Sequence, residues 1–439
     1  MLRQLKNGSK KIGRSPVAHN AAALYGVQIC RKVFPLVSVP YLARTLHAAG
    51  WGTVAFVLSL GEIGALLIEF GFNLSATREM SQNRHSKESC ASIMSGVLGA
   101  QAILGLISIL FAVIVSLHVA LLRSHPEMIA AGLLYSLAQG CTPLWFFQGL
   151  ERLRLAAGLE IAAKSAALAG IFVFVHRPED GFKVIALQAL AAAVSTSIGI
   201  ALAIREFSWR YPRPTEVIEA LRKGWPMFVF RSAESLYGVG NSFVLGLFAG
   251  PEAVGYFAVA EKISKAIFGL LNPIREALYP RLSYLAASAR EQAAKLARTG
   301  IALMTAAGAF LSCILFLSAP QLIRLLAGPG FGRAVPVLRI LAALPLILSV
   351  TYSVGLQWLL PLGRDGIVNR IILCGGVLNI TLAFLLAPHF AEVGMAGSVL
   401  SAELLVCFSM VWTVCRTTDL WARSEARQSC EVAASAISD

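Results

Sequence analysis

Charged residues interrupt the most apolar parts of this sequence. Residues 256–283 read YFAVAEKISKAIFGLLNPIREALYPRLS, and this run contains Glu261, Lys262 and Lys265. On insertion scales, a charged side chain at the centre of a membrane costs about 2.5–3.5 kcal/mol. If the run crosses a membrane, its charges must therefore be paired with opposite charges, hydrated or bound to a ligand.

Similar charges occur in other apolar runs, and at 100° per residue they gather on one face of each expected helix. The basic members, which we expect to bind substrate in a cationic cavity, are Arg31, Lys32, Arg231, Lys262 and Lys265. The acidic members, which we expect either to bind a coupling ion or to pair with the basic residues, are Glu62, Glu69, Glu234 and Glu261. Lys and Arg suit a phosphate or pyrophosphate group. Two interpretations stay open at this point, namely structural ion pairs between helices and a hydrated cavity for an anionic ligand.

Motifs for several kinds of enzyme chemistry are missing from the sequence. There is no G-x-x-x-x-G-K-[ST] run for ATP, no H-E-x-x-H and no G-x-S-x-G. The eight cysteines are scattered without a C-x-x-C pair, so neither a metal site nor a disulfide framework is indicated. We therefore expect no cofactor, no metal and no enzymatic activity.

The composition is that of a membrane protein. Of 439 residues, 56% are hydrophobic and only 14% are charged, against about 25% charged in an ordinary soluble domain. Apolar runs of about 20 residues, each long enough to cross a bilayer, recur along the chain. We expect spans near 21–43, 52–72, 92–120, 128–149, 156–175, 184–204, 225–249, 254–280, 300–327, 335–361, 367–387 and 394–415.

The short loops between these spans predict an orientation. With the N-terminus in the cytoplasm, nearly all loop Lys and Arg residues fall on the cytoplasmic side, as the positive-inside rule requires. The opposite side carries only Arg44, Arg123, Arg177, Lys183 and Arg333. Both termini are therefore expected in the cytoplasm. This distribution also accounts for the net charge of +14, and no nucleic-acid partner is expected.

An internal repeat predicts two similar halves. WGTVAFVLS (51–59) aligns with VGYFAVAEK (254–262), which matches Gly52 with Gly255 and Ala55 with Ala258. The second expected span thus resembles the eighth, as in a parallel repeat. The predicted fold is an all-α polytopic membrane protein, with about twelve transmembrane helices in two parallel-repeat six-helix lobes around a central cavity. The expected boundaries are a basic N-terminal segment (1–20), an N-lobe (21–206), a cytoplasmic linker (207–224), a C-lobe (225–416) and a cytoplasmic tail (417–439).

Four longer stretches carry a family resemblance. Residues 41–84, 143–154, 244–283 and 335–346 resemble bacterial Wzx-type O-antigen and polysaccharide flippases, especially in GFNLSATRE, PLWFFQG and VGYFAVAEK. These belong to the multidrug/oligosaccharidyl-lipid/polysaccharide exporter superfamily. The resemblance implies two six-helix lobes that open alternately to each face of the inner membrane. It also implies a cationic cavity with basic residues from the first and eighth helices, where Arg31, Lys32, Lys262 and Lys265 lie.

The resemblance implies an undecaprenyl-pyrophosphate-linked oligosaccharide as the substrate, moved from the cytoplasmic to the periplasmic leaflet. The expected partners are this lipid-linked oligosaccharide and membrane lipids, with a polysaccharide polymerase and a chain-length regulator as candidates. The absence of an ATP site favours coupling to an ion gradient. The alternatives are a multidrug/cation antiporter of the same superfamily, a peptidoglycan-precursor flippase and, from another class, a polysaccharide polymerase or ligase.

Overall fold

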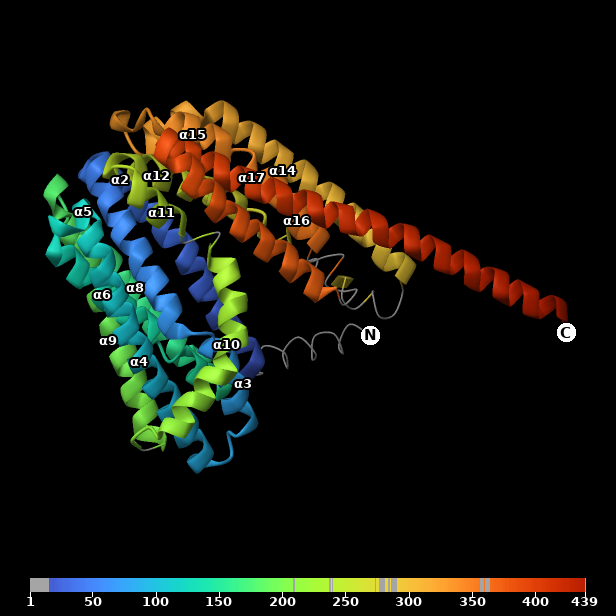
Figure 1. Ribbon diagram of the computed structural model, residues 1–439, viewed down its shortest axis with the longest axis horizontal. Helices are drawn as coiled ribbons and strands as arrows, with labels where there is room; N and C mark the ends of the chain where they lie inside the picture. Colours follow the sequence, from blue (N-terminus) through green and yellow to red (C-terminus); the bar gives the residue numbers. More distant parts are fainter. Residues whose placement is uncertain are drawn as a thin grey trace, which may run out of the picture.

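The protein is a bundle of helices that forms a V (Figure 1). The computed structural model describes residues 16–207, 210–236, 240–272, 290–355 and 364–438, with single positions 238, 274, 275, 281, 282, 285 and 359. No strand occurs among these residues. The helices are α2 (Pro16–Glu69), α3 (Phe72–Gln82), α4 (Lys87–His118), α5 (Ala120–Arg123), α6 (Pro126–Gly140), α7 (Leu144–Gly149), α8 (Leu153–Phe174), η1 (Pro178–Asp180), α9 (Gly181–Phe207), α10 (Pro214–Leu236), α11 (Gly240–Phe248), α12 (Pro251–Gly269), α14 (Arg290–Leu326), η2 (Pro329–Phe331), α15 (Ala334–Leu341), α16 (Leu344–Val354) and α17 (Asp365–Ser438).

Several of these helices are long and apolar enough to cross a membrane. Seven such stretches occur in the described part of the chain. The two longest helices are each divided by a backbone kink, α2 at His47 (φ 57°, ψ −177°) and α17 at Ala391 (φ 46°, ψ −125°). A membrane helix that reverses at such a kink makes two crossings. The all-α polytopic membrane fold expected from the sequence is therefore confirmed.

The ends of some helices differ from the sequence-based prediction. The seventh span was expected to begin at 225, but α10 begins at Pro214, because proline suits the first turn of a helix and Val217 and Ala220 are buried. The fourth span was expected to continue to 149. Instead α6 ends at Gly140 and α7 begins after Pro143, which cannot donate a hydrogen bond within a continuous helix.

The two arms of the V are an N-terminal bundle, α2 to α9, and a C-terminal bundle, α11 to α17 (Figure 1). Helix α10 packs along α3 and α4 of the N-terminal bundle. The arms meet at the end that holds the kink of α2 and the start of α12, which we call the closed end. They diverge toward the end that holds α3, which we call the open end. The contact between α2 and α12 is the most extensive between any two helices.

The hydrophobic cores follow this shape. At the closed end one continuous cluster joins both bundles and includes Val54 and Phe56 of α2, Phe257 of α12 and Leu338 of α15. Toward the open end each bundle has its own cluster, one around Trp145 and the other around Met410. Close packing of apolar side chains therefore holds the arms together at the closed end, whereas the separate clusters stabilise each arm alone.

Close packing within the N-terminal bundle gives a stability prediction. A Cβ atom on Gly140 of α6 would lie 2.5 Å from Cβ of Ile68 in α2. Because overpacking a core costs about 1–3 kcal/mol, Gly140→Ala is expected to lower the melting temperature of the purified protein. Gly158→Ala is the matched control, because a Cβ atom there meets no atom within 4 Å. Equal melting temperatures for the two variants would contradict the packing described here.

Candidate functional site

The candidate site lies on the open-end side of the contact between α2 and α12, where these two helices separate. Glu62 of α2 is exposed, and so are Lys262 and Lys265 of α12. Glu62 interacts electrostatically with Lys262, Lys265 and Glu261, all on α12, and with Lys164 on α8. The structure thus brings four of the predicted site residues together across the two bundles. Three of these residues, Glu62, Lys262 and Lys265, are exposed.

A buried polar network holds one side of this cluster. Nζ of Lys265 lies 3.0 Å from Oε1 of Glu261, one turn earlier on α12. The same carboxylate oxygen accepts a hydrogen bond of 2.9 Å from Nδ2 of Asn241 on α11, and Asn379 on α17 donates to Oδ1 of Asn241 at 2.9 Å. Lys265 also donates to the carbonyl of Gly238 at 3.2 Å. Glu261 therefore serves as a structural partner that links α11, α12 and α17.

Lys262 differs from its neighbour on the helix. It is exposed, and it forms no ion pair with any residue that the structure describes. Its ammonium group carries three donors and a full charge. Of the predicted basic residues with a described side chain, Lys262 is the one whose charge is available to a ligand without the loss of an existing ion pair.

Arg231 and Glu69 form a second, separate pair. The guanidinium of Arg231 on α10 lies 3.6 Å from Oε2 of Glu69, and Oε1 of Glu69 accepts a hydrogen bond from the amide of Asn73. Glu69 follows Glu62 by two turns, so it lies about 10 Å nearer the open end of the bundle at 1.5 Å per residue. Nearby, Phe70 stacks on Phe228 at a centroid distance of 4.6 Å. The Arg231–Glu69 ion pair therefore connects α10 to the C-terminal end of α2.

Three predicted site residues cannot be placed in this geometry. The backbones of Arg31 and Lys32 belong to α2, and Glu234 belongs to α10, but their side chains lie outside the described residues.

Two further polar positions border the cluster and were given no role from the sequence. Glu403 on α17 interacts electrostatically with Lys265. Asn379 is 1% exposed, and its Oδ1 atom has no hydrogen-bond partner among the residues that the structure describes. The position of Asn379 in an otherwise apolar span could have marked it as a functional candidate in the sequence. On α8, Glu160 and Lys164 form an i,i+4 ion pair at 3.2 Å.

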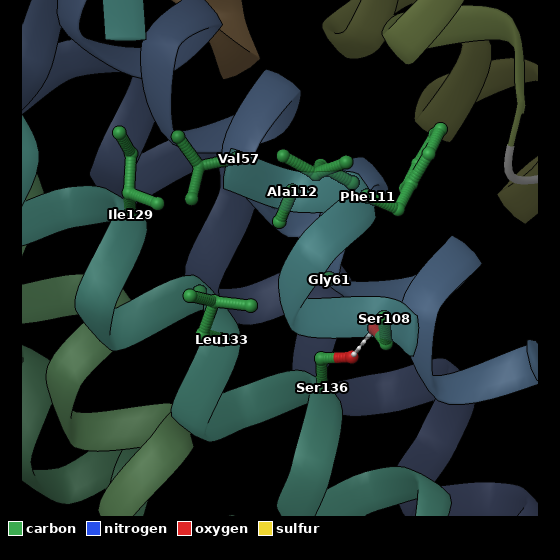
Figure 2. Close-up of a pocket in the computed structure, with 10 residues that line it drawn as sticks. Val57, Gly61, Ser108, Phe111, Ala112, Ile129, Leu133 and Ser136 are labelled. Carbon is green, nitrogen blue, oxygen red and sulfur yellow. Dashed lines mark hydrogen bonds between the residues drawn. The ribbon is translucent and has the colours of Figure 1, made fainter. Parts of the chain in front are cut away.

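Two hollows in the described part of the molecule lie elsewhere. One, of about 10 Å³, sits between α2, α4 and α6, where the hydroxyl oxygens of Ser108 and Ser136 are 3.3 Å apart (Figure 2). It has room for no more than one water molecule. A larger hollow of about 420 Å³ lies at the closed end and is lined by residues of both bundles. Among the described residues, no group of three His, Cys, Asp or Glu side chains could hold a metal ion.

Comparison with known sequences gives consistent matches. Residues 17–286 match a family described as "Polysaccharide biosynthesis protein". A protein of Escherichia coli (strain K12) named "Putative O-antigen transporter" is 31% identical over 403 residues, which are 90% of this chain and 96% of the relative. A protein of Shigella dysenteriae with the same name is 27% identical over 405 residues, which are 90% of this chain and 99% of the relative.

Comparison with solved structures finds membrane transporters with a similar fold. An inward-facing multidrug resistance MATE family transporter of the MOP superfamily matches with a TM-score of 0.64 at 14% identity, over 89% of this chain and 99% of that one. The lipid II flippase MurJ in an inward closed conformation matches with a TM-score of 0.67 at 11% identity, over 90% of this chain and 87% of that one. At these identities the likeness concerns the fold alone.

Proposed function

Because the chain belongs to the polysaccharide biosynthesis protein family, we propose that it is a flippase for a lipid-linked oligosaccharide. The family match and the two relatives confirm the Wzx-type resemblance found in the sequence. The names of these relatives also confirm the expectation of a transporter rather than an enzyme. The multi-pass membrane character is established by the apolar helices.

In this proposal the substrate is an undecaprenyl-pyrophosphate-linked oligosaccharide, the repeat unit of an O-antigen or another surface polysaccharide. It moves from the cytoplasmic to the periplasmic leaflet of the bacterial inner membrane, while its lipid tail stays in the bilayer. A polysaccharide polymerase and a chain-length regulator remain the candidate partners. The observation that carries the proposal is Lys262, an exposed cation without an ion pair to any described residue, at the level where the bundles separate.

The remaining basic residues complete the proposed binding set in different ways. Lys265 and Arg231 already contact the carboxylates of Glu261 and Glu69, so a pyrophosphate would have to share or replace those partners. Arg31 and Lys32 keep the role that the resemblance implies for the first helix. Direct coordination by Lys262, with support from the other four residues, is the arrangement we propose.

The positive-inside pattern supports an orientation for this cycle. Arg44 and Arg333 lie near the closed end. The sequence assigns Arg123, Arg177 and Lys183 to the same side, whereas the many other loop Lys and Arg residues belong to the opposite side. The closed end then faces the periplasm and the open end faces the cytoplasm. In this orientation the structure corresponds to the state that receives substrate, and lobes 21–206 and 225–416 would rock to release it.

We propose Glu62 as the coupling residue, because the residue is exposed, interacts electrostatically with Lys262 and Lys265 of the other bundle, and forms no ion pair within the described part of the chain. Glu62→Gln removes the charge while keeping the size of the side chain. In proteoliposomes, an imposed proton or sodium gradient is expected to accelerate transport by the wild-type protein but not by Glu62→Gln. Glu62→Asp, which keeps the charge, is the matched control. Equal acceleration of the wild type and Glu62→Gln would contradict this role.

One observation favours a second candidate function, multidrug/cation antiport. With the Glu160–Lys164 pair included, the cluster has four carboxylates and three ammonium groups. The carboxylates are those of Glu62, Glu160, Glu261 and Glu403, and the ammonium groups are those of Lys164, Lys262 and Lys265. Such a balance suits a cation. The flippase keeps priority because the sequence relatives named in the comparison are O-antigen transporters.

A genetic experiment separates the two functions. The gene is expressed in a bacterium that lacks its own O-antigen flippase but retains the rest of the pathway. Restored surface polysaccharide without increased drug resistance is the expected result. Increased resistance to cationic drugs without restored polysaccharide, at normal protein levels in the membrane, would favour the antiporter instead.

A further inference from the structure

Two glycines bring α2 and α12 into backbone contact at the closed end. A Cβ atom added to Gly52 would overlap the carbonyl oxygen of Pro251 and lie 2.7 Å from the amide nitrogen of Gly255. A Cβ atom added to Gly255 would overlap the carbonyl oxygen of Ala48. No other residue type fits at either position unless the helices move apart.

The two contacts are related by the internal repeat. The repeat aligns Gly52 with Gly255, and the same offset aligns Ala48 with Pro251. Each glycine therefore packs against the carbonyl four residues before the other glycine, so that the crossing has an approximate two-fold symmetry. A mutual contact of this kind ties the two halves of the repeat together at one point, from which α2 and α12 diverge toward Glu62 and Lys262.

The surroundings of this crossing are mostly apolar. Phe56 of α2 stacks on Phe243 of α11 at a centroid distance of 5.6 Å, and its ring lies where a side chain on Gly246 would be. At the rim, the guanidinium of Arg44 donates a hydrogen bond to the carbonyl of Leu325 at the end of α14. Apart from this Arg44 contact, no side-chain hydrogen bond joins the two bundles at the crossing among the described residues. The surface can therefore separate and close again, because separation breaks few polar contacts.

We propose that the Gly52–Gly255 crossing is the outer gate of the transport cycle, closed in this structure and opened once per turnover. The proposal rests on the alternating access of the proposed function. Since only glycine permits the closed contact, a single added methyl group should shift the protein toward the conformation that is open at this end.

The test compares Gly52→Ala with Gly397→Ala, a control in α17 where a Cβ atom meets no atom within 4 Å. Both are combined with the reporter Ala258→Cys, because Ala258 is 1% exposed and lies one turn inside the crossing. Intact cells are treated with a membrane-impermeant maleimide, and modification of the introduced thiol is measured on its own peptide by mass spectrometry. Gly52→Ala is expected to raise the labelling rate at least about fivefold and to abolish transport. Equal labelling and equal transport for the two variants would overturn the proposal.

A second measurement leaves both glycines in place. It therefore tests the proposed gate even if the Gly52→Ala protein does not accumulate in the membrane. Ala49 and Glu252 line the 420 Å³ hollow from opposite bundles. In the double variant Ala49→Cys and Glu252→Cys, a cleavable bifunctional maleimide is expected to stop transport, and cleavage should restore it. Unimpaired transport by the cross-linked protein would overturn the gate. A third outcome separates the gate from the proposed substrate. If Gly52→Ala raises the labelling rate but cells that express the wild-type protein make no surface polysaccharide, the proposed substrate is wrong and the proposed gate is supported.

Discussion

Replacing Lys262 with alanine is expected to reduce polysaccharide transport by about 10- to 100-fold without unfolding the protein. The reason is that a hydrogen bond to a charged group contributes about 1.5–3 kcal/mol, and each 1.4 kcal/mol corresponds to a tenfold effect. Lys262 has no ion pair among the described residues, so its removal leaves no buried partner behind. Surface polysaccharide is measured in cells that lack their own flippase, and the amount of membrane-inserted protein is measured in parallel.

Two further variants sharpen this experiment. Lys262→Arg keeps the positive charge and should retain most of the transport. Lys183→Ala removes an exposed lysine that pairs with Asp180 at 2.7 Å, far along the chain from the site, and should transport at the wild-type rate. Wild-type transport by Lys262→Ala, at a normal protein level, would remove Lys262 from the substrate site.

Replacing Glu261 with alanine is expected to act mainly on stability. This change removes the acceptor of the Asn241 amide and the ion partner of Lys265, both of which depend on the same oxygen. A buried group that loses its hydrogen-bond partner costs about 1–3 kcal/mol. The melting temperature of the purified protein in detergent should therefore fall for Glu261→Ala and stay near the wild-type value for Lys262→Ala.

The intermediate substitution tests the network itself. Glu261→Gln keeps a carbonyl oxygen that can accept from Asn241 but loses the charge that holds Lys265, so its melting temperature should lie between those of the wild type and Glu261→Ala. A Glu261→Ala variant that melts with the wild type would show that the network does not stabilise the fold.

Contacts that depend on local spacing can be read from the sequence. The pairs Glu261–Lys265 and Glu160–Lys164 follow from i,i+4 geometry on a helix. The repeat pointed to Gly52 and Gly255 as equivalent positions, although their mutual contact was not foreseen. Apolar runs of the right length located the membrane helices, because a span needs about 20 apolar residues.

Contacts between distant segments could not be read from the sequence. Asn379 and Asn241 are 138 positions apart, and their hydrogen bond exists only because α17 packs against α11. The partner of Arg231 was likewise open, since Glu69 meets it through the packing of α10 on the N-terminal bundle. The early start of α10 was missed because residues 214–224 are polar on one side and gain their stability from burial of Val217 and Ala220 against neighbouring helices.

The central claim is tested most directly by lipid-linked oligosaccharide movement in proteoliposomes that contain the purified protein. The substrate is an undecaprenyl-pyrophosphate-linked oligosaccharide, and an impermeant glycosidase reports which leaflet holds it. We predict transbilayer movement with the wild-type protein, slower movement of a substrate that lacks the pyrophosphate, and little movement with Lys262→Ala. Movement no faster than in protein-free liposomes, or equal rates with and without the pyrophosphate, would contradict the account.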